Sequence, residues 1–93
     1  MHKGILTNKE LLVNLERYKS EYYTRGKAIE VYHILNTNSD CLSFTNESDY
    51  KMFYEQMEIL RRCESIMDKE KYATTFAGAL IKLMLILHRI DDG

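Results

Sequence analysis

The stretch FAGALIKLMLILHRI, residues 76–90, decides how this chain folds. From Phe76 to Leu87 only Lys82 interrupts a run of Ala, Gly, Leu, Ile, Met and Phe. On a helical wheel, the apolar residues of this region cover roughly 250° of arc, whereas a helix with two neighbours needs about 160–200°. Two polar residues, Thr74 and His88, fall outside the single polar strip. That strip consists of Lys71, Thr75, Lys82 and Arg89, with Gly78 between them.

Three arrangements account for the excess apolar arc. The helix lies at the centre of a monomeric bundle, or two copies meet across a two-fold axis, or the surface is a groove for a partner's helix. The sequence favours the second arrangement, an obligate homodimer. We expect self-association through residues on the side of the wheel that adjoins the polar strip, namely Leu83, Ile86 and Ile90.

The composition predicts one small helical domain. The chain has 93 residues, of which 45% are hydrophobic and 29% charged, and it contains no proline. A chain without proline has few helix breakers, which favours long helices over a turn-rich β fold. The formal net charge is −1, so no global field attracts nucleic acid or an anionic membrane. We therefore disfavour a nucleic-acid partner and expect no membrane partner.

Capping signals divide the chain into three predicted helices. Thr7 and Glu10 form a capping box, and the apolar stripe behind it continues to about Leu35, with Gly26 allowing a neighbouring helix to approach. Residues 36–46 form a loop whose Leu42 and Phe44 pack back onto the bundle. The second helix begins after Thr45 or Asn46, and the third runs from about Lys69 to Ile90 after Asp68 as its cap.

The predicted fold is all-α, a three-helix bundle with a long first helix, in which the second and third helices form a hairpin or a kinked pair. A four-helix fold, with the first helix broken near Gly26, is the alternative. The two cysteines, Cys41 and Cys63, show no CxxC pair, and the N-terminus shows no signal peptide. The run over 76–87 is shorter than the ~20 residues that span a bilayer. We expect a cytoplasmic protein.

No catalytic, metal or cofactor motif is recognisable in the sequence. The histidines, His2, His33 and His88, fall in different predicted elements, and no HExxH or paired-ligand spacing occurs. No Ser or Cys has a neighbouring His with an orienting carboxylate. We therefore expect a protein that is not an enzyme and that needs no cofactor.

Two regions supply candidate contact residues. Glu64 is a carboxylate inside an apolar arc, so it must pair with an arginine or tyrosine or else contact a partner. The segment RYKSEYYTRGK, residues 17–27, alternates basic residues with tyrosines, and leaves Tyr23, Lys19 and Lys27 on the predicted outer face. These residues are candidates for contact with a protein partner or an anion.

Two functional hypotheses follow from these observations. The first is a small non-enzymatic regulatory protein that acts by protein–protein interaction, a style typical of phage and mobile-element inhibitors of a host factor. The second is a binder of a small phosphate-bearing ligand, such as a nucleotide, in which the basic strip Lys71, Thr75, Lys82 and Arg89 holds the anion.

Overall fold

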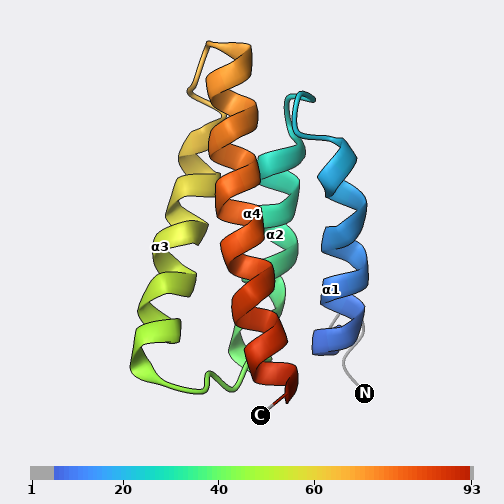
Figure 1. The fold of residues 1–93 in the computed structure, drawn as a ribbon, viewed down its shortest axis with the longest axis vertical. Helices are drawn as coiled ribbons and strands as arrows, with labels where there is room; N and C mark the ends of the chain where they lie inside the picture. The colour runs from blue at the N-terminus through green and yellow to red at the C-terminus, as the bar shows by residue number, and fades with distance from the viewer. Residues whose placement is uncertain (1–5, 93) are drawn as a thin grey trace.

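The computed structural model describes residues 6–92, with side chains from residue 6 to residue 90, and every long element in it is a helix (Figure 1). No strand occurs in this part of the chain, so the predicted all-α class is confirmed. The helices are α1 (Asn8–Glu16), α2 (Lys27–Asn38), α3 (Glu47–Cys63) and α4 (Lys69–Asp92). Short 3₁₀ turns follow the first two helices at η1 (Arg17–Ser20) and η2 (Ser39–Cys41).

The four helices form an up-down-up-down bundle, in which α1 and α3 run opposite to α2 and α4 (Figure 1). The longest helix, α4, lies in front of α2 in this view, with α3 on one side and α1 on the other. Its closest packing is against α3 and α1, and α2 packs mainly on α3. The hairpin form of α3 and α4 is confirmed, because residues 64–68 separate two distinct helices.

The predicted long first helix is wrong, and the four-helix alternative is correct. The chain leaves the α-helix after Glu16, passes through η1 and a turn, and starts α2 at Lys27. Gly26 has φ +89°, a left-handed conformation that a β-carbon disfavours. A β-carbon there would meet nothing within 4 Å, so the glycine is needed for its backbone angle. The predicted close approach of a neighbouring helix is not its role.

Local caps begin the other three helices where the sequence predicts. The Thr7 hydroxyl accepts from Glu10 N at 3.1 Å, and the Glu10 carboxylate accepts from Thr7 N at 2.9 Å. Asn46 Oδ1 accepts from the backbone N–H of the residue three positions on, at 2.8 Å. Asp68 does the same for Lys71 N at 2.8 Å. Each cap satisfies an N–H that has no partner inside its helix.

The core draws fully buried side chains from all four helices, and α4 supplies the largest share. From α4 it takes Tyr72, Phe76, Ala79, Leu80, Leu83, Met84, Ile86 and Leu87. Leu42 and Phe44 of the connecting loop pack against this core as predicted, and the Phe44 ring lies 5.1 Å from the Phe53 ring. The predicted third helix ends at about Ile90, and α4 extends two residues further, to Asp92; Gly93 lies outside the described residues.

Among the described helices, one is long and apolar enough to cross a membrane, by length and composition alone: α4 over Lys69–Ile90. Of the window that meets this criterion, 44% is buried inside the bundle. The inward side of α4 packs against the other helices, and this packing accounts for its apolar composition.

Candidate functional site

The exposed side of α4 carries the main candidate surface. Its core residues fall within an arc of roughly 160° on the wheel, which is what packing between two neighbours requires. The outward side still carries two large apolar side chains, since Ile81 is 50% exposed and Leu85 is 51% exposed. We define the α4 stripe as the outward residues around this pair: Thr74, Gly78, Ile81, Lys82, Leu85 and His88.

The residues predicted for self-association do not form this surface. Leu83 and Ile86 are 0% exposed within a single chain, so they cannot lie between two folded copies. Ile90 is half-buried and packs against the core. The prediction chose the wrong flank of the polar strip, because these residues face the bundle interior.

A signal for the correct flank was present in the sequence. Thr74 and His88 are the two polar residues that fall outside the strip. On the wheel, His88 and the polar strip lie on either side of Ile81 and Leu85, and Thr74 lies between them. Polar residues on both sides of an apolar pair indicate a solvent-facing side. In the structure Thr74 and His88 are exposed, as this signal requires.

The stripe borders a shallow cavity between α1 and α4. The cavity has a volume of about 210 Å³. Its walls come from the end of α1, from η1 and from α4, and consist of Glu16, Lys19, Ile81, Met84, Leu85 and His88. Gly78 lies on the same side of α4, one turn before Ile81, and a β-carbon there would meet nothing within 4 Å. The surface is therefore open to a second backbone at Gly78 and slightly hollowed beside Leu85.

The charged side chain of the stripe is positive, and no acidic residue lies near it on α4. The sequence places no acidic residue between Glu70 and Asp91, which spans the whole outward side of α4. Lys82 is exposed and forms no ion pair among the described side chains. On the α1 side of the cavity, Lys19 pairs with Glu16 at 3.2 Å, so that pair is internally neutral. The free charge beside the apolar pair is positive.

The predicted anion-binding strip shares one side of α4 but does not converge. At about 1.5 Å per residue, Lys71 and Arg89 lie roughly 27 Å apart along the helix, too far for one small anion to touch both. Arg89 is already committed, because its guanidinium donates to both carboxylate oxygens of Asp49 at 2.8 and 2.9 Å. This contact lowers the pKa of Asp49 through the hydrogen bonds from Arg89. The strip therefore offers single cations rather than a phosphate pocket.

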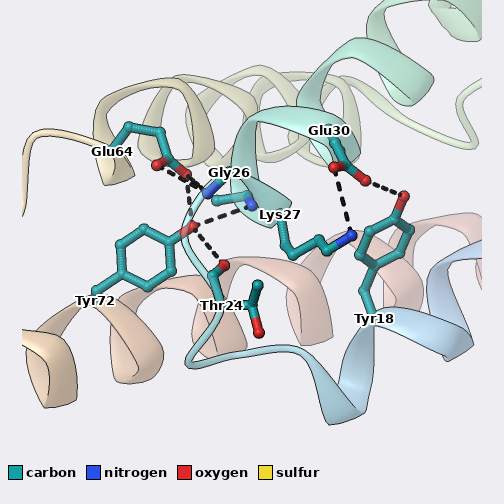
Figure 2. Close-up of polar contacts among 8 residues, drawn as sticks. Tyr18, Thr24, Gly26, Lys27, Glu30, Glu64 and Tyr72 are labelled. Atoms are coloured by element: carbon teal, nitrogen blue, oxygen red, sulfur yellow. Dashed lines mark hydrogen bonds and ion pairs between the residues drawn. The ribbon is translucent and has the colours of Figure 1, made fainter.

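A second polar site closes the end of the bundle at which α2 and α4 begin (Figure 2). It gathers the end of α3, the first turns of α4 and the turn before α2. The Glu64 carboxylate accepts from Gly26 N at 3.1 and 3.2 Å and from the Tyr72 hydroxyl at 2.5 Å. The Tyr72 hydroxyl also accepts from Ala28 N at 3.3 Å. We call these residues, together with Thr24 and Arg25, the capping cluster.

The capping cluster does for α2 what a local side chain does for the other helices. Gly26 has no side chain to accept from the free N–H groups of the first turn of α2. Glu64, directly after α3, and Tyr72 of α4 supply these acceptors, and the carboxylate lies at the positive end of the helix dipole. Arg25 completes the arrangement by donating to the Glu64 carbonyl at 3.2 Å and lying 4.8 Å from the centre of the Tyr72 ring.

The chemistry of the capping cluster is structural. Burial, reinforced by the hydrogen bond with Glu64, raises the pKa of Tyr72 to about 12. Tyr72 is 1% exposed and therefore stays neutral. Burial also raises the pKa of the Cys63 thiol to about 11, so this thiol is a poor nucleophile. No buried side-chain nitrogen or oxygen in the described part of the chain lacks a hydrogen-bond partner.

The contact candidates from the sequence fall into different places. Glu64 has the tyrosine partner predicted for it, inside the capping cluster. Lys27 pairs with Glu30 at 3.5 Å beside the Tyr18 hydroxyl (Figure 2). Tyr23 is 58% exposed, with the Lys69 ammonium 5.9 Å from its ring centre. Of the candidates in residues 17–27, only Lys19 reaches the α4 stripe, through the cavity.

The described residues contain no group of three or more His, Cys, Asp and Glu side chains that could hold a metal ion. His33 and His88 are both exposed and lie on different helices, whereas His2 lies outside the described residues. Comparison of the chain with protein-family models, with curated proteins and with solved structures finds no match. Any functional assignment must therefore come from the chain's own geometry.

Proposed function

We propose that this chain is a non-enzymatic helical protein that acts by binding a protein partner through the α4 stripe. The observation that carries the proposal is the pair Ile81 and Leu85. Two large aliphatic side chains, each about half exposed and one helical turn apart, lie beside a cavity on the helix that supplies most of the core. Exposed apolar side chains grouped on one surface are typical of interaction sites.

The capping cluster differs from the α4 stripe in a way that supports the proposal. Its buried polar side-chain atoms are all hydrogen-bonded within the chain. The α4 stripe, in contrast, combines apolar side chains, an open glycine and an unpaired lysine on a rigid helix. Rigid presentation of a few anchor residues reduces the entropy cost of binding.

The experiment compares two variants with the same chemical change. Leu85→Glu places a charge in the stripe, and Met67→Glu places one at a residue that is 87% exposed in the turn between α3 and α4. Both variants should fold, as shown by unchanged helical circular dichroism. A photo-crosslinker at Thr74, an exposed and uncharged residue of the stripe, in cells that express the chain, should give one dominant protein adduct with the otherwise wild-type chain and with Met67→Glu.

The same adduct should be lost with Leu85→Glu. If the adduct pattern is the same for both variants, or if Met67→Glu alone removes it, the proposal is wrong. A crosslinker that reacts only with lipid or nucleic acid would also overturn it.

A further inference from the structure

We infer that the partner segment is an amphipathic helix with acidic residues flanking its apolar side, seated along the groove between α1 and α4. This inference rests on the proposed function and specifies the class of partner. It is carried by three features of the described residues: the spacing of the apolar pair, the two-helix groove and the sign of the charge around it.

The spacing favours a helix as the occupant. Ile81 and Leu85 are four residues apart, so they form a ridge along α4 of the kind that interdigitates with the side chains of another helix. The cavity beside them has walls from the end of α1 at Glu16, from Lys19 of the following turn η1, and from four residues of α4, which runs antiparallel to α1. A helix in that groove would add to the bundle, and its apolar residues at i, i+3, i+4 and i+7 would face this ridge. Gly78 leaves room for its backbone one turn away.

The charge selects an acidic occupant. Lys82 stands next to Ile81 and three residues before Leu85, and no carboxylate on the outward side of α4 opposes it. His88 also lines the cavity, and its imidazole N–H can donate a hydrogen bond to a carboxylate. Glutamates on the flanks of a docked helix would pair with these groups, whereas lysines there would meet like charge.

The same argument disfavours a second copy of the chain as the occupant. In an isologous contact, the stripe of one copy faces the stripe of the other. The stripe contains Lys82 and no acidic residue, so two stripes bring like charges together. The half-exposed apolar pair is also small compared with the ~800 Å² per partner that a stable interface buries.

The test uses two stapled synthetic helices of about 15 residues, because unconstrained helices of that length are marginal in water. Both peptides carry leucines at i, i+4, i+7 and i+11. One has glutamates flanking the leucines, and the other has lysines at the same positions. Each is titrated into the ¹⁵N-labelled full chain while the amide resonances of α1 and α4 are followed.

The acidic peptide should shift resonances over residues 74–89 and along the facing side of α1, and the basic peptide should not. Charge reversal at the stripe, Lys82→Glu, should weaken binding of the acidic peptide about tenfold. The matched variant Lys51→Glu should leave binding unchanged, because the exposed Lys51–Glu47 pair lies on the outer side of α3. Raising the salt concentration should weaken the binding.

Equal binding of the two peptides would overturn the acidic assignment, and so would binding of neither at millimolar concentration. If the peptides fail while the Thr74 crosslink to a protein still depends on Leu85, the stripe remains a docking surface and only the class of partner is wrong. If the wild type is a dimer whose α4 stripe is protected by a second copy, this inference is wrong.

Discussion

The capping cluster and the α4 stripe both depend on α4, yet they differ in every physical respect. In the cluster, no buried polar side-chain atom lacks a hydrogen-bond partner, and the central tyrosine is almost fully buried. In the stripe, two aliphatic side chains face solvent beside a lysine without a counter-ion. Closed, satisfied polar groups stabilise a fold, whereas exposed apolar and charged groups remain free to contact another molecule. α4 thus contributes both to a closed polar cluster and to the exposed side that we propose for recognition.

The largest expected difference separates two leucines of α4. Leu83→Ala removes a side chain that is 0% exposed and should lower the unfolding free energy by about 2–5 kcal/mol. Leu85→Ala removes one that is half exposed and should cost no more than about 1 kcal/mol. Urea denaturation followed by circular dichroism measures both. Equal losses would mean that the outward and inward sides of α4 are not distinct.

The next effect tests the cap that α3 supplies to α2. Glu64→Ala removes the acceptor of Gly26 N–H and leaves the Tyr72 hydroxyl only the longer bond to the Thr24 carbonyl, which should cost about 2–4 kcal/mol. Glu64→Gln keeps an acceptor oxygen and should recover part of this loss. The same denaturation experiment measures both losses. The amide-resonance titration should show that neither variant changes peptide binding at the stripe. A Glu64→Ala variant as stable as wild type would remove the cluster's structural role.

The pH dependence of stability sharpens the same comparison. Tyr72 keeps its proton in the folded chain up to about pH 12, whereas an unfolded tyrosine ionises near pH 10. Below pH 10 this contribution is fully present, and as the pH rises from 10 towards 12 the unfolded state loses a proton first, so stability falls. The Tyr72→Phe variant should be less stable at pH 7 by about 1–2 kcal/mol.

The alkaline fall of the Tyr72→Phe variant should be shallower than that of wild type. Some fall should remain, because burial also raises the pKa of Tyr18 and of Tyr22. Thermal denaturation between pH 8 and pH 11 measures it. Identical alkaline slopes for wild type and variant would contradict the buried, hydrogen-bonded tyrosine.

The smallest expected effects distinguish the two glycines. Gly26→Ala places a β-carbon at φ +89° and should cost about 1–2 kcal/mol. Gly78→Ala adds a β-carbon in open space on a helix and should raise the unfolding free energy by up to about 1 kcal/mol. At the stripe, the added methyl group should weaken peptide binding. Changes of the same sign in stability would refute the distinct roles of the two positions.

Sequence predicts those features of this fold that depend on neighbours in the chain. The caps at Thr7, Asn46 and Asp68 each act within three residues, and all are recognisable from the sequence. The cap of α2 is not, because Glu64 is 38 residues from Gly26 and only the folded bundle brings them together. Because this distant cap cannot be recognised, the apolar pattern on both sides of Gly26 predicts one continuous helix.

The candidate surface was predicted in part, for a related reason. The wheel gives the apolar arc of α4 and its polar strip, so it indicates that some apolar residues remain exposed. It does not give the directions in which α1 and α3 lie. Those directions bury Leu83 and expose Leu85, and they depend on the break before α2, which turns α1 into a separate helix beside the stripe.

The most direct test of the central claim is sedimentation equilibrium of the wild-type chain at micromolar concentration. If one chain buries the inward apolar residues of α4 and leaves the stripe free for a different partner, the protein should sediment as an 11.0 kDa monomer. Addition of the acidic peptide should raise the mass by that of one peptide, and Leu85→Glu should prevent this increase. A wild-type species of about 22 kDa, twice 11.0 kDa, that Leu85→Glu converts to monomer would contradict the account and show that a second copy occupies the stripe.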